Sequence, residues 1–298
     1  MTDGGLLVIG DVVTDVVARH ATALAHGTDT PARIRTLPGG AGANVACWAA
    51  RSGCHDVRLL ARVGADSADW HRDALQRAGV RCLLAVDDEE PTATVVALVD
   101  SAAERTFLTD SGAVLRLSPD DWSPSLLDGV AHLHLSGYLL FAATSRSTAL
   151  LALGEARRRR IPVSVDPASA GFIAELGADR FLTAVEGVDL LLPNADEARL
   201  LTGLPEPADA AAKLSLLADR VVVTLGADGA LLAAAGAVVR HVPGVRAGGA
   251  VDSTGAGDAF TGGFLAAHLA GADDASAMAA GCRAGAEAVT TVGGRPGP

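Results

Sequence analysis

The sequence predicts an α/β protein built on a doubly wound, mostly parallel sheet with a small β-sheet lid. Short apolar runs such as Leu6–Gly10 alternate with helical stretches along most of the chain, which is typical of parallel strands covered by helices on both faces. Two intervals, at about 12–37 and 81–109, contain strand-like pieces with no helix between them. Because no low-complexity linker or internal repeat divides the 298 residues, we expect one domain, 1–298, in which these intervals form the lid.

The individual elements are delimited by glycines and by capping residues. Leu6–Gly10 is a buried strand, residues 42–53 have helical composition and a glycine stop, and residues 57–64 form the next strand. A helix begins at Ser67 or Asp69 and ends at Gly79. The same alternation continues with strands in HLHLSGYLL, IPVSVDPAS, VDLLLPN, VVVTLG and the hairpin GALLAAAGAVVRHV, and with helices in ATSRSTALLALGEARRRR, ADEARLLTG and at about 256–270 and 273–292.

The composition excludes several classes of partner. A net charge of −11 gives no counterion release on DNA or RNA, so we expect no nucleic-acid partner. The single lysine, Lys213, follows no glycine-rich loop, which excludes a Walker-type phosphate loop. Four dispersed cysteines fit a reducing compartment. The acidic N-terminus leads straight into a strand and no apolar run is long enough for a bilayer, so we expect no membrane partner and a cytoplasmic location.

The stretch VDSTGAGDAFTGGFLAAHLA, residues 251–270, places small residues and a carboxylate at the start of a helix. Free amides at a helix N-terminus suit a phosphate oxygen, and small side chains let an anion approach the backbone. Asp258 follows directly, within reach of whatever these amides bind. The simpler interpretation is a helix capped by Ser253 or Thr254, with Asp258 complementing the helix dipole. We favour the anion site, because a cap needs one side chain and no run of glycines.

Two segments resemble the signatures of a known family. DSTGAGDAFTGGF is similar to the C-terminal signature of ribokinase-like (PfkB-type) carbohydrate and nucleoside kinases, and PGGAGANVA, residues 38–46, is similar to their N-terminal Gly-Gly signature. The order of strands, lid intervals and helices also fits, so the resemblance covers nearly the whole chain. It implies a ribokinase-like fold, phosphoryl transfer to a hydroxyl group, and ATP and Mg²⁺ as cofactors.

The resemblance implies a catalytic role for each residue at the helix start. Asp258 would be the general base that takes the proton from the hydroxyl attacking the γ-phosphate. Phosphoryl transfer depends above all on placement and charge stabilisation. Charge on the transferring phosphoryl group would therefore be held in an anion hole made by the backbone amides of Gly255, Ala256 and Gly257.

Substrate contacts are implied at the N-terminal signature and just beyond the first strand. Gly39 and Gly40 would let the substrate approach the backbone, and Asn44 would hydrogen-bond its hydroxyls, with a helix cap as the equal alternative for Asn44. Asp11 and Asp15 follow the first strand, where ligand sites of parallel sheets lie, and two carboxylates there suit sugar hydroxyls. The simpler alternatives are turn chemistry for Asp11 and a solvated charge for Asp15.

Two metal sites are implied by the resemblance. Asn194 and Glu197 match the family's Asn-x-x-Glu pattern, which would organise Mg²⁺ and the phosphates through water. The same spacing suits a helix capping box, and the two roles are compatible. Asp252 and Thr254, with backbone from about 288–293, resemble the monovalent-cation site of ribokinase-like members, which would hold K⁺.

The nucleotide contacts are implied by two further segments. Thr224, Gly226 and Gly229 in VVVTLGADGALL resemble the family's nucleotide-binding turn, with a plain hairpin turn as the alternative. The segment from Cys282 to Gly294 would flank the adenine. Asp166, at a strand end, is as compatible with a turn as with contact to a phosphate-bound metal.

The chain departs from ribokinases at two places. Ala41 stands where they usually carry a lysine, and HLHLSGYLLF lacks the carboxylate that they use there, which argues against D-ribose as the acceptor. Tyr138 and Phe141 in that region offer instead the apolar or stacking surface that a nucleoside needs. A dinucleotide-dependent oxidoreductase is disfavoured, because Gly40-x-Gly42 lacks a third glycine at the required spacing.

The expected activity is that of an ATP-dependent phosphotransferase acting on a hydroxymethyl group of a small, ribose- or fructose-like sugar. An adenosine-like nucleoside kinase on the same fold and a non-catalytic sugar-binding regulator are the alternatives. Lid strands often pair between subunits in the resembled family, so the resemblance also implies a homodimer formed through the lid.

Overall fold

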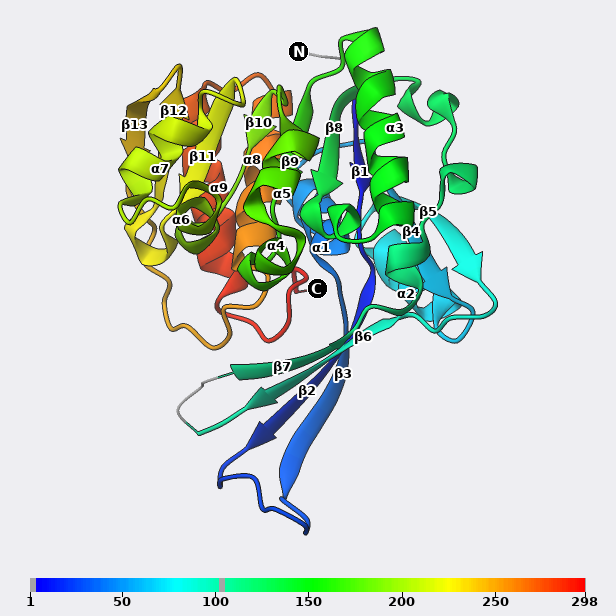
Figure 1. Cartoon of the computed structure of the whole chain (residues 1–298). Helices are drawn as coiled ribbons and strands as arrows, with labels where there is room; N and C mark the ends of the chain where they lie inside the picture. Colours follow the sequence, from blue (N-terminus) through cyan, green and yellow to red (C-terminus); the bar gives the residue numbers. More distant parts are fainter. Residues whose placement is uncertain (1–3, 102–104, 298) are drawn as a thin grey trace.

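Two sheets of different size make up the part of the chain that the computed structural model describes, residues 4–101 and 105–297 (Figure 1). Within these residues, a nine-stranded sheet has the order β13-β12-β11-β10-β9-β8-β1-β4-β5, and a four-stranded sheet has the order β3-β2-β6-β7. The large sheet carries helices on both faces, and the small sheet projects from one end of this body (Figure 1). The structure confirms the predicted α/β fold with a separate small sheet.

The large sheet is parallel from β5 across to β11, and the hairpin β12–β13 continues it antiparallel, as the sequence predicts. Both faces of the central strand β1 are buried: Leu7 and Ile9 pack on one side and Leu6 and Val8 on the other. A continuous apolar run is the expected sequence of such a strand. The strands are β1 (Gly5–Ile9), β4 (Val57–Gly64), β5 (Val80–Asp87), β8 (Val130–Ser136), β9 (Val163–Asp166), β10 (Leu190–Leu191), β11 (Arg220–Thr224), β12 (Ala230–Ala234) and β13 (Ala237–Val242).

The helices form two layers, each with its own hydrophobic core against one face of the large sheet. The first layer comprises α1 (Ala41–Arg51), α2 (Ala68–Arg77), α8 (Ala256–Leu269) and α9 (Asp274–Ala288). The second comprises α3 (Ala143–Arg159), α4 (Ala170–Leu176), α5 (Ala178–Val185), α6 (Ala195–Thr202) and α7 (Pro207–Leu214). Short 3₁₀ turns are η1 (Gly112–Arg116), η2 (Pro119–Asp121), η3 (Pro124–Leu127), η4 (Gly137–Leu140) and η5 (Gly226–Asp228). No helix in the described ranges is both long and apolar enough to cross a membrane.

The small sheet is formed by the two predicted lid intervals. It contains β2 (Val13–His20), β3 (Ala32–Gly39), β6 (Ala93–Val99) and β7 (Arg105–Asp110), and β2 follows β1 almost directly in the chain (Figure 1). The interval 81–109 also covers most of β5, but β5 pairs with β4 in the large sheet, so the lid part of this interval begins at β6. Residues 102–104 of the same interval lie outside the described residues.

Candidate active site

The predicted site residues gather beyond the carboxyl ends of the parallel strands, where the lid meets the large sheet. This is the usual place for a ligand in a doubly wound fold. A cavity of about 710 Å³ is lined by the lid strands β2, β6 and β7, by α1, η4 and α4, and by the start of α8. A second cavity, of about 190 Å³, lies between the start of α8 and the ends of β9, β10 and β11. Asp258 and Gly255 line both cavities, so they stand where the two meet.

The backbone at the start of α8 is open to the smaller cavity. Gly255 holds the N-cap position, with φ of 73°, in place of Ser253 or Thr254, which the alternative interpretation put there. A Cβ on Gly255 would lie 2.5 Å from Cα of Gly294, which explains the glycine. A Cβ on Gly257 would meet only open space. Gly255, Ala256 and Gly257 line the smaller cavity, so the first turn of the helix faces it, and the amide of Ala256 also donates a long hydrogen bond, 3.3 Å, to the carbonyl of Ser253.

Asp258 lies in the first turn of α8 and faces the junction of the two cavities. Asn44, on α1, donates a 2.8 Å hydrogen bond from Nδ2 to Oδ2 of Asp258. Burial, and next the nearby Asp166 carboxylate, raise the pKa of Asp258 well above its usual range, and the Asn44 bond opposes this rise. Asn44 is therefore inside the helix and orients the carboxylate, rather than capping α1 as the alternative for this residue had it.

Asp11 is buried and fully hydrogen-bonded. Its Oδ2 accepts from the amide of Ala41 at 2.6 Å, and its Oδ1 accepts from the amide of Gly42 at 3.1 Å and from the hydroxyl of Ser136 at 2.8 Å. These contacts place a carboxylate at the start of α1, where it complements the helix dipole. Asp11 also lines the larger cavity, so the positioning role and the predicted substrate contact are compatible.

Asp15 lines the larger cavity from the lid strand β2 and lies directly against Gly39, where a Cβ would come 2.0 Å from the carboxylate. Burial raises the pKa of Asp15 to about 7, and the charge of Arg295 works against this rise. Gly40, the residue before α1, has φ of 98° and lines the same cavity. The predicted substrate residues Asp15 and Gly40 thus face one space, with Gly39 behind them.

Arg295 is a residue that the sequence did not point to. Its Nη2 donates to the carbonyl of Gly39 at 3.0 Å, whereas Nε and Nη1 are inaccessible to solvent and have no partner among the described residues. Burial lowers the pKa of this guanidinium, and Asp15 and Cys47 oppose the change. The buried guanidinium of Arg295 thus lies near the carboxylate of Asp15, although the two residues are far apart in the sequence.

The C-terminal segment that carries Arg295 is held to the site by several bonds. The carbonyl of Gly294 accepts from Nε1 of Trp48 at 2.9 Å, and the amide of Gly293 donates to Oδ2 of Asp252 at 3.0 Å. The Oδ1 of Asp252 accepts from the amide and the hydroxyl of Thr254. The Oδ2 of Asp252 therefore fastens the loop before α8 to this segment, whereas Oδ1 holds the loop itself together. The K⁺ site at Asp252 and Thr254 stays a prediction.

Asn194 and Glu197 form the predicted capping box at the start of α6. The amide of Glu197 donates to Oδ1 of Asn194, and the amide of Asn194 donates to Oε2 of Glu197, both at 2.9 Å. Both side chains also line the smaller cavity. The predicted capping box is confirmed, and within it the carboxylate of Glu197 still borders the smaller cavity beside α8.

Asp166 and Glu197 share the smaller cavity with Asp258, and none of the described residues that line it is basic. Burial, and next the neighbouring Asp166, raise the pKa of Glu197 to about 8. Burial also raises the pKa of Asp166 to about 6, against hydrogen bonds from the amide of Ala168 and the hydroxyl of Thr261. Two uncompensated carboxylates beside an open helix N-terminus suit a divalent cation that binds together with phosphate.

These residues fit the Mg²⁺ that the resemblance implies. Among the residues described, no group of three His, Cys, Asp or Glu side chains is arranged to hold a metal ion by itself. Mg²⁺ usually keeps several waters and takes one or two carboxylates together with phosphate oxygens. Asp166 and Glu197 line one cavity and offer such a pair. The hydrogen bond from the amide of Ala168 confirms the turn role of Asp166, whereas its contact with a phosphate-bound metal stays a prediction.

The predicted nucleotide residues are only partly brought together. Thr224, at the end of β11, lines the smaller cavity, whereas Gly226 and Gly229 lie on the turn before β12 and line neither cavity. A Cβ on Gly229 would meet the carbonyl of Val242 at 2.0 Å, so close packing of two backbones accounts for this glycine. Cys282 is buried in the hydrophobic core of the α8–α9 layer. The nucleotide roles of these residues stay predictions.

Comparison with known proteins places the whole chain in one group. Residues 4–298 match the model of the pfkB family carbohydrate kinase. A fructokinase from Klebsiella pneumoniae is 33% identical over 277 residues, which cover 89% of this chain and 84% of the fructokinase.

Solved structures of sugar kinases share the fold of this chain. A probable sugar kinase from Rhizobium etli superposes with a TM-score of 0.90 at 22% identity and covers 100% of this chain and 96% of its own. A putative Ribokinase II from E. coli, solved in complex with ATP and Mg²⁺, superposes with a TM-score of 0.84 at 25% identity over 98% of this chain and 94% of its own.

Proposed function

The chain belongs to the pfkB family of carbohydrate kinases and is an ATP-dependent phosphotransferase, and we propose that it phosphorylates a hydroxymethyl group on a sugar unit, with Asp258 as the general base. The observation that carries this proposal is the place of Asp258 at the junction of the two cavities. The larger cavity takes the acceptor, and the smaller one takes the phosphates of ATP. An acceptor hydroxyl next to Asp258 then faces the open amides of α8.

Proton transfer and charge stabilisation are divided between neighbouring residues. The Asp258 carboxylate accepts the proton of the attacking hydroxyl, and Asn44 holds that carboxylate in position through its 2.8 Å hydrogen bond. The amides of Gly255, Ala256 and Gly257 stabilise charge on the phosphoryl group during transfer. A base with a raised pKa binds the proton more readily than an ordinary aspartate, so burial of Asp258 favours this step.

The residues that would hold Mg²⁺ are Asp166 and Glu197, with Asn194 beside them. A bound Mg²⁺ would neutralise phosphate charge. In the proposal these residues bind and orient the nucleotide, and their shared site lies next to the anion hole, so the phosphates reach the helix amides with their charge compensated.

A kinase assay with a matched pair of variants tests the proposal. Asp258→Asn should lower turnover by roughly 10²–10⁴-fold, because the general base is lost while the side-chain shape is kept. ADP formation is measured with ATP and Mg²⁺ over a panel of pentoses, hexoses and nucleosides. Asp209→Asn is the control, since Asp209 is also in the first turn of a helix but is exposed and lines neither cavity. Equal turnover of the two variants would contradict the assignment of the base.

We extend the proposal to a homodimer formed through the lid. The side chains of Ile34 and Leu108 are 64% and 59% exposed on lid strands, and pairing of two lids would bury them. Light scattering over a range of protein concentrations should give the mass of two chains. A mass of one chain at every concentration would contradict the dimer and leave the kinase proposal unaffected.

A further inference from the structure

The larger cavity has an aromatic wall on the side formed by η4 and α4. Phe141 and Phe172 stack with their ring centroids 5.1 Å apart and their planes at 23°. Tyr138 meets both rings edge-on, at centroid distances of 5.9 Å from Phe141 and 5.5 Å from Phe172. All three rings line the cavity and are only partly buried by the protein. They form one continuous apolar surface that faces the space for the acceptor.

The lid adds a fourth ring to this space. Phe107, on β7, lines the same cavity and is 51% exposed. The chain contains six phenylalanines and one tyrosine, and three of those phenylalanines and the tyrosine line this single cavity. In a protein that builds its core mainly from aliphatic side chains, such a concentration marks a surface for a ligand rather than for core packing.

The same cavity is also lined by polar side chains. Asp15, Asn44 and Asp258 are three of them, and Asn44 and Asp258 are hydrogen-bonded to each other at 2.8 Å. Tyr138 connects this group with the phenyl rings, because it contacts both rings and is near enough to Asp11 and Asp258 for their charges to add to burial in raising the pKa of the tyrosine.

The cavity has further polar residues on the elements that carry the rings. Thr109 on β7 and Ser111 just after it line the cavity close in the chain to Phe107, and Glu175 lines it from α4, the helix of Phe172. Carboxylates, an amide, aromatic rings and further hydrogen-bonding groups therefore face one space.

This set of residues fits a molecule with a polyhydroxylated part and a flat unsaturated part that carries polar groups at its edge. We propose that the acceptor is a nucleoside, with its sugar at Asp15, Asn44 and Asp258 and its base against Phe141 and Phe172. The inference rests on the proposed kinase function and names the class of its acceptor. Proteins commonly bind a nucleobase by stacking it on aromatic side chains, because every base has a flat π-face. Thr109, Ser111 and Glu175 supply hydrogen-bond donors and acceptors for the edge of the base.

A free hexose or pentose matches this cavity less well. Its hydroxyls need hydrogen-bond partners all around, and rings that cover part of it would leave some of these unsatisfied. A cavity of about 710 Å³ is also in the range that accommodates drug-sized ligands. Stacking of the rings on the apolar face of a free sugar is the competing explanation, and it predicts a different response to mutation.

The test compares nucleosides with their free sugars on the intact protein. Calorimetry without ATP measures binding of uridine, cytidine, adenosine and guanosine and of D-ribose and D-fructose, and the kinase assay measures kcat/KM for the same compounds. We expect at least one nucleoside to bind roughly 10-fold or more tightly than either free sugar. Phe172→Leu should weaken nucleoside binding by about 10- to 100-fold, the effect of losing one base-stacking ring, and should leave the affinity for D-ribose unchanged.

Two further variants control for damage to the fold. Phe172→Tyr keeps the ring and should retain nucleoside affinity within a few-fold. Phe181→Leu makes the same change in the buried core, away from the cavity. It should lower stability but leave the nucleoside affinity of the folded protein unchanged.

The outcomes separate this inference from the kinase proposal. If free sugars bind and react better than every nucleoside, or if Phe172→Leu weakens both classes equally, the acceptor is a sugar and the inference is overturned, while an Asp258-dependent reaction still upholds the kinase. If nucleosides bind in a Phe172-dependent manner but no compound gives ADP, the kinase proposal fails and the nucleoside site stands.

Discussion

Asp258 and Asp87 are both enclosed carboxylates, but their surroundings change their pKa values in opposite directions. Asp258 faces the cavities with one amide hydrogen bond and three other acids nearby, and its pKa is raised. Asp87, whose side chain is 0% exposed, lies at the end of β5, and its pKa is held well below its usual range, mainly by the amide of Glu90, with help from Arg62. The difference lies in the compensation of charge rather than in burial alone.

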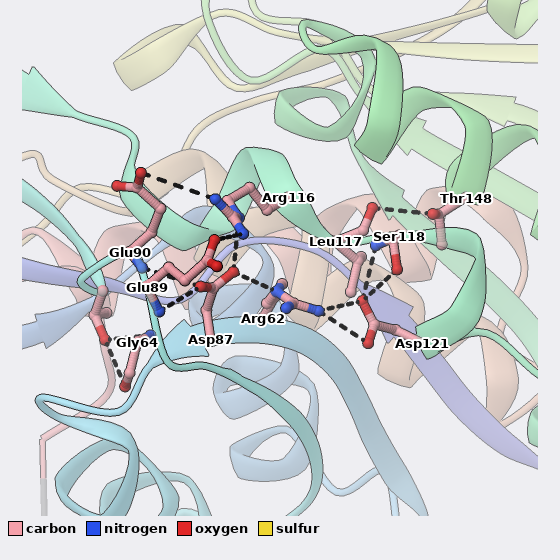
Figure 2. Close-up of polar contacts among 11 residues, drawn as sticks. Arg62, Gly64, Asp87, Glu89, Glu90, Arg116, Leu117, Ser118, Asp121 and Thr148 are labelled. Atoms are coloured by element: carbon pink, nitrogen blue, oxygen red, sulfur yellow. Dashed lines mark hydrogen bonds and ion pairs between the residues drawn. The ribbon is translucent and has the colours of Figure 1, made fainter.

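The surroundings of Asp87 form a network that joins the large sheet to the segment entering β6 and to the segment leaving β7 (Figure 2). Arg62 on β4 and Arg116 on η1 each place Nε 2.8 Å from Oδ2 of Asp87. Arg62 also donates to both oxygens of Asp121, at 3.1 and 2.9 Å. The amides of Glu89 and Glu90 donate to Oδ1 of Asp87 at 3.0 Å.

The comparison shows where the folded chain keeps charge uncompensated. At the root of the lid each buried charge meets a fixed partner, so the network stabilises the structure. At the candidate active site the carboxylates Asp15, Asp166, Glu197 and Asp258 have few cationic partners among the described residues. Burial raises the pKa of each of them, so that protonation relieves their charge in the unliganded protein. Perturbed carboxylates in a cavity are a known mark of function.

The largest effect on folding is expected at Asp87. Asp87→Asn removes the charge that faces two arginines and should lower the free energy of unfolding by about 2 kcal/mol, in the range of charged hydrogen bonds. Urea denaturation followed by circular dichroism measures it. Glu89→Gln, which changes the exposed partner of the same Arg116, is the control and should cost well under half as much. An equal loss of unfolding free energy in the two variants would contradict a special contribution of the buried Asp87 to stability.

The next effect concerns Arg295, whose positive charge opposes the raised pKa of Asp15. Arg295→Met should raise the pKa of Asp15 further above its value of about 7, because the opposing charge is gone. If ionised Asp15 binds the acceptor, a rise of about one pKa unit lowers its ionised fraction at pH 7 from about one half to about one tenth, so KM for the acceptor should rise roughly 5-fold with kcat nearly unchanged. The acid limb of kcat/KM should move to higher pH, and the difference should shrink above pH 9.

The conservative change separates charge from packing at this position. Arg295→Lys keeps the positive charge and should restore most of the wild-type pH profile. A profile for Arg295→Met that does not move, or a loss of kcat alone, would contradict the role of Arg295 in keeping Asp15 ionised.

The smallest effect is expected at Asp258, where the substitution should raise the stability of the folded protein instead of lowering it. A carboxyl whose pKa is raised in the folded state destabilises the fold once the pH exceeds the ordinary pKa of an aspartate, because the buried group must then either keep a proton or carry an unpaired charge. Asp258→Asn should therefore make the unliganded protein more stable, by about 1 kcal/mol at pH 8, and make no difference near pH 4. Thermal unfolding at both pH values measures this, and a loss of stability at pH 8 would contradict the uncompensated state of Asp258.

Much of this protein was readable from short stretches of sequence. The alternation of apolar runs with helical segments predicted the strands and helices of the large sheet, and the Asn194–Glu197 spacing predicted the capping box that the structure contains. Two points were less well predicted. The lid interval at 81–109 extended too far toward the N-terminus, because β5 is as apolar as a lid strand. The N-cap of α8 is Gly255 rather than Ser253 or Thr254, and the backbone of Gly294 occupies the space next to it.

The sequence by itself therefore determined the class of fold, the two signatures and Asp258 as the candidate base, because each of these depends on residues close together in the chain. Only the tertiary structure decided that Arg295 lies beside Asp15, that Asp166 and Glu197 share a cavity, and that Phe107 joins Phe141 and Phe172 around one space. These pairs are separated by tens to hundreds of residues. Their distances, and the pKa shifts that follow from them, are fixed by how helices and strands pack and by what that packing excludes from water.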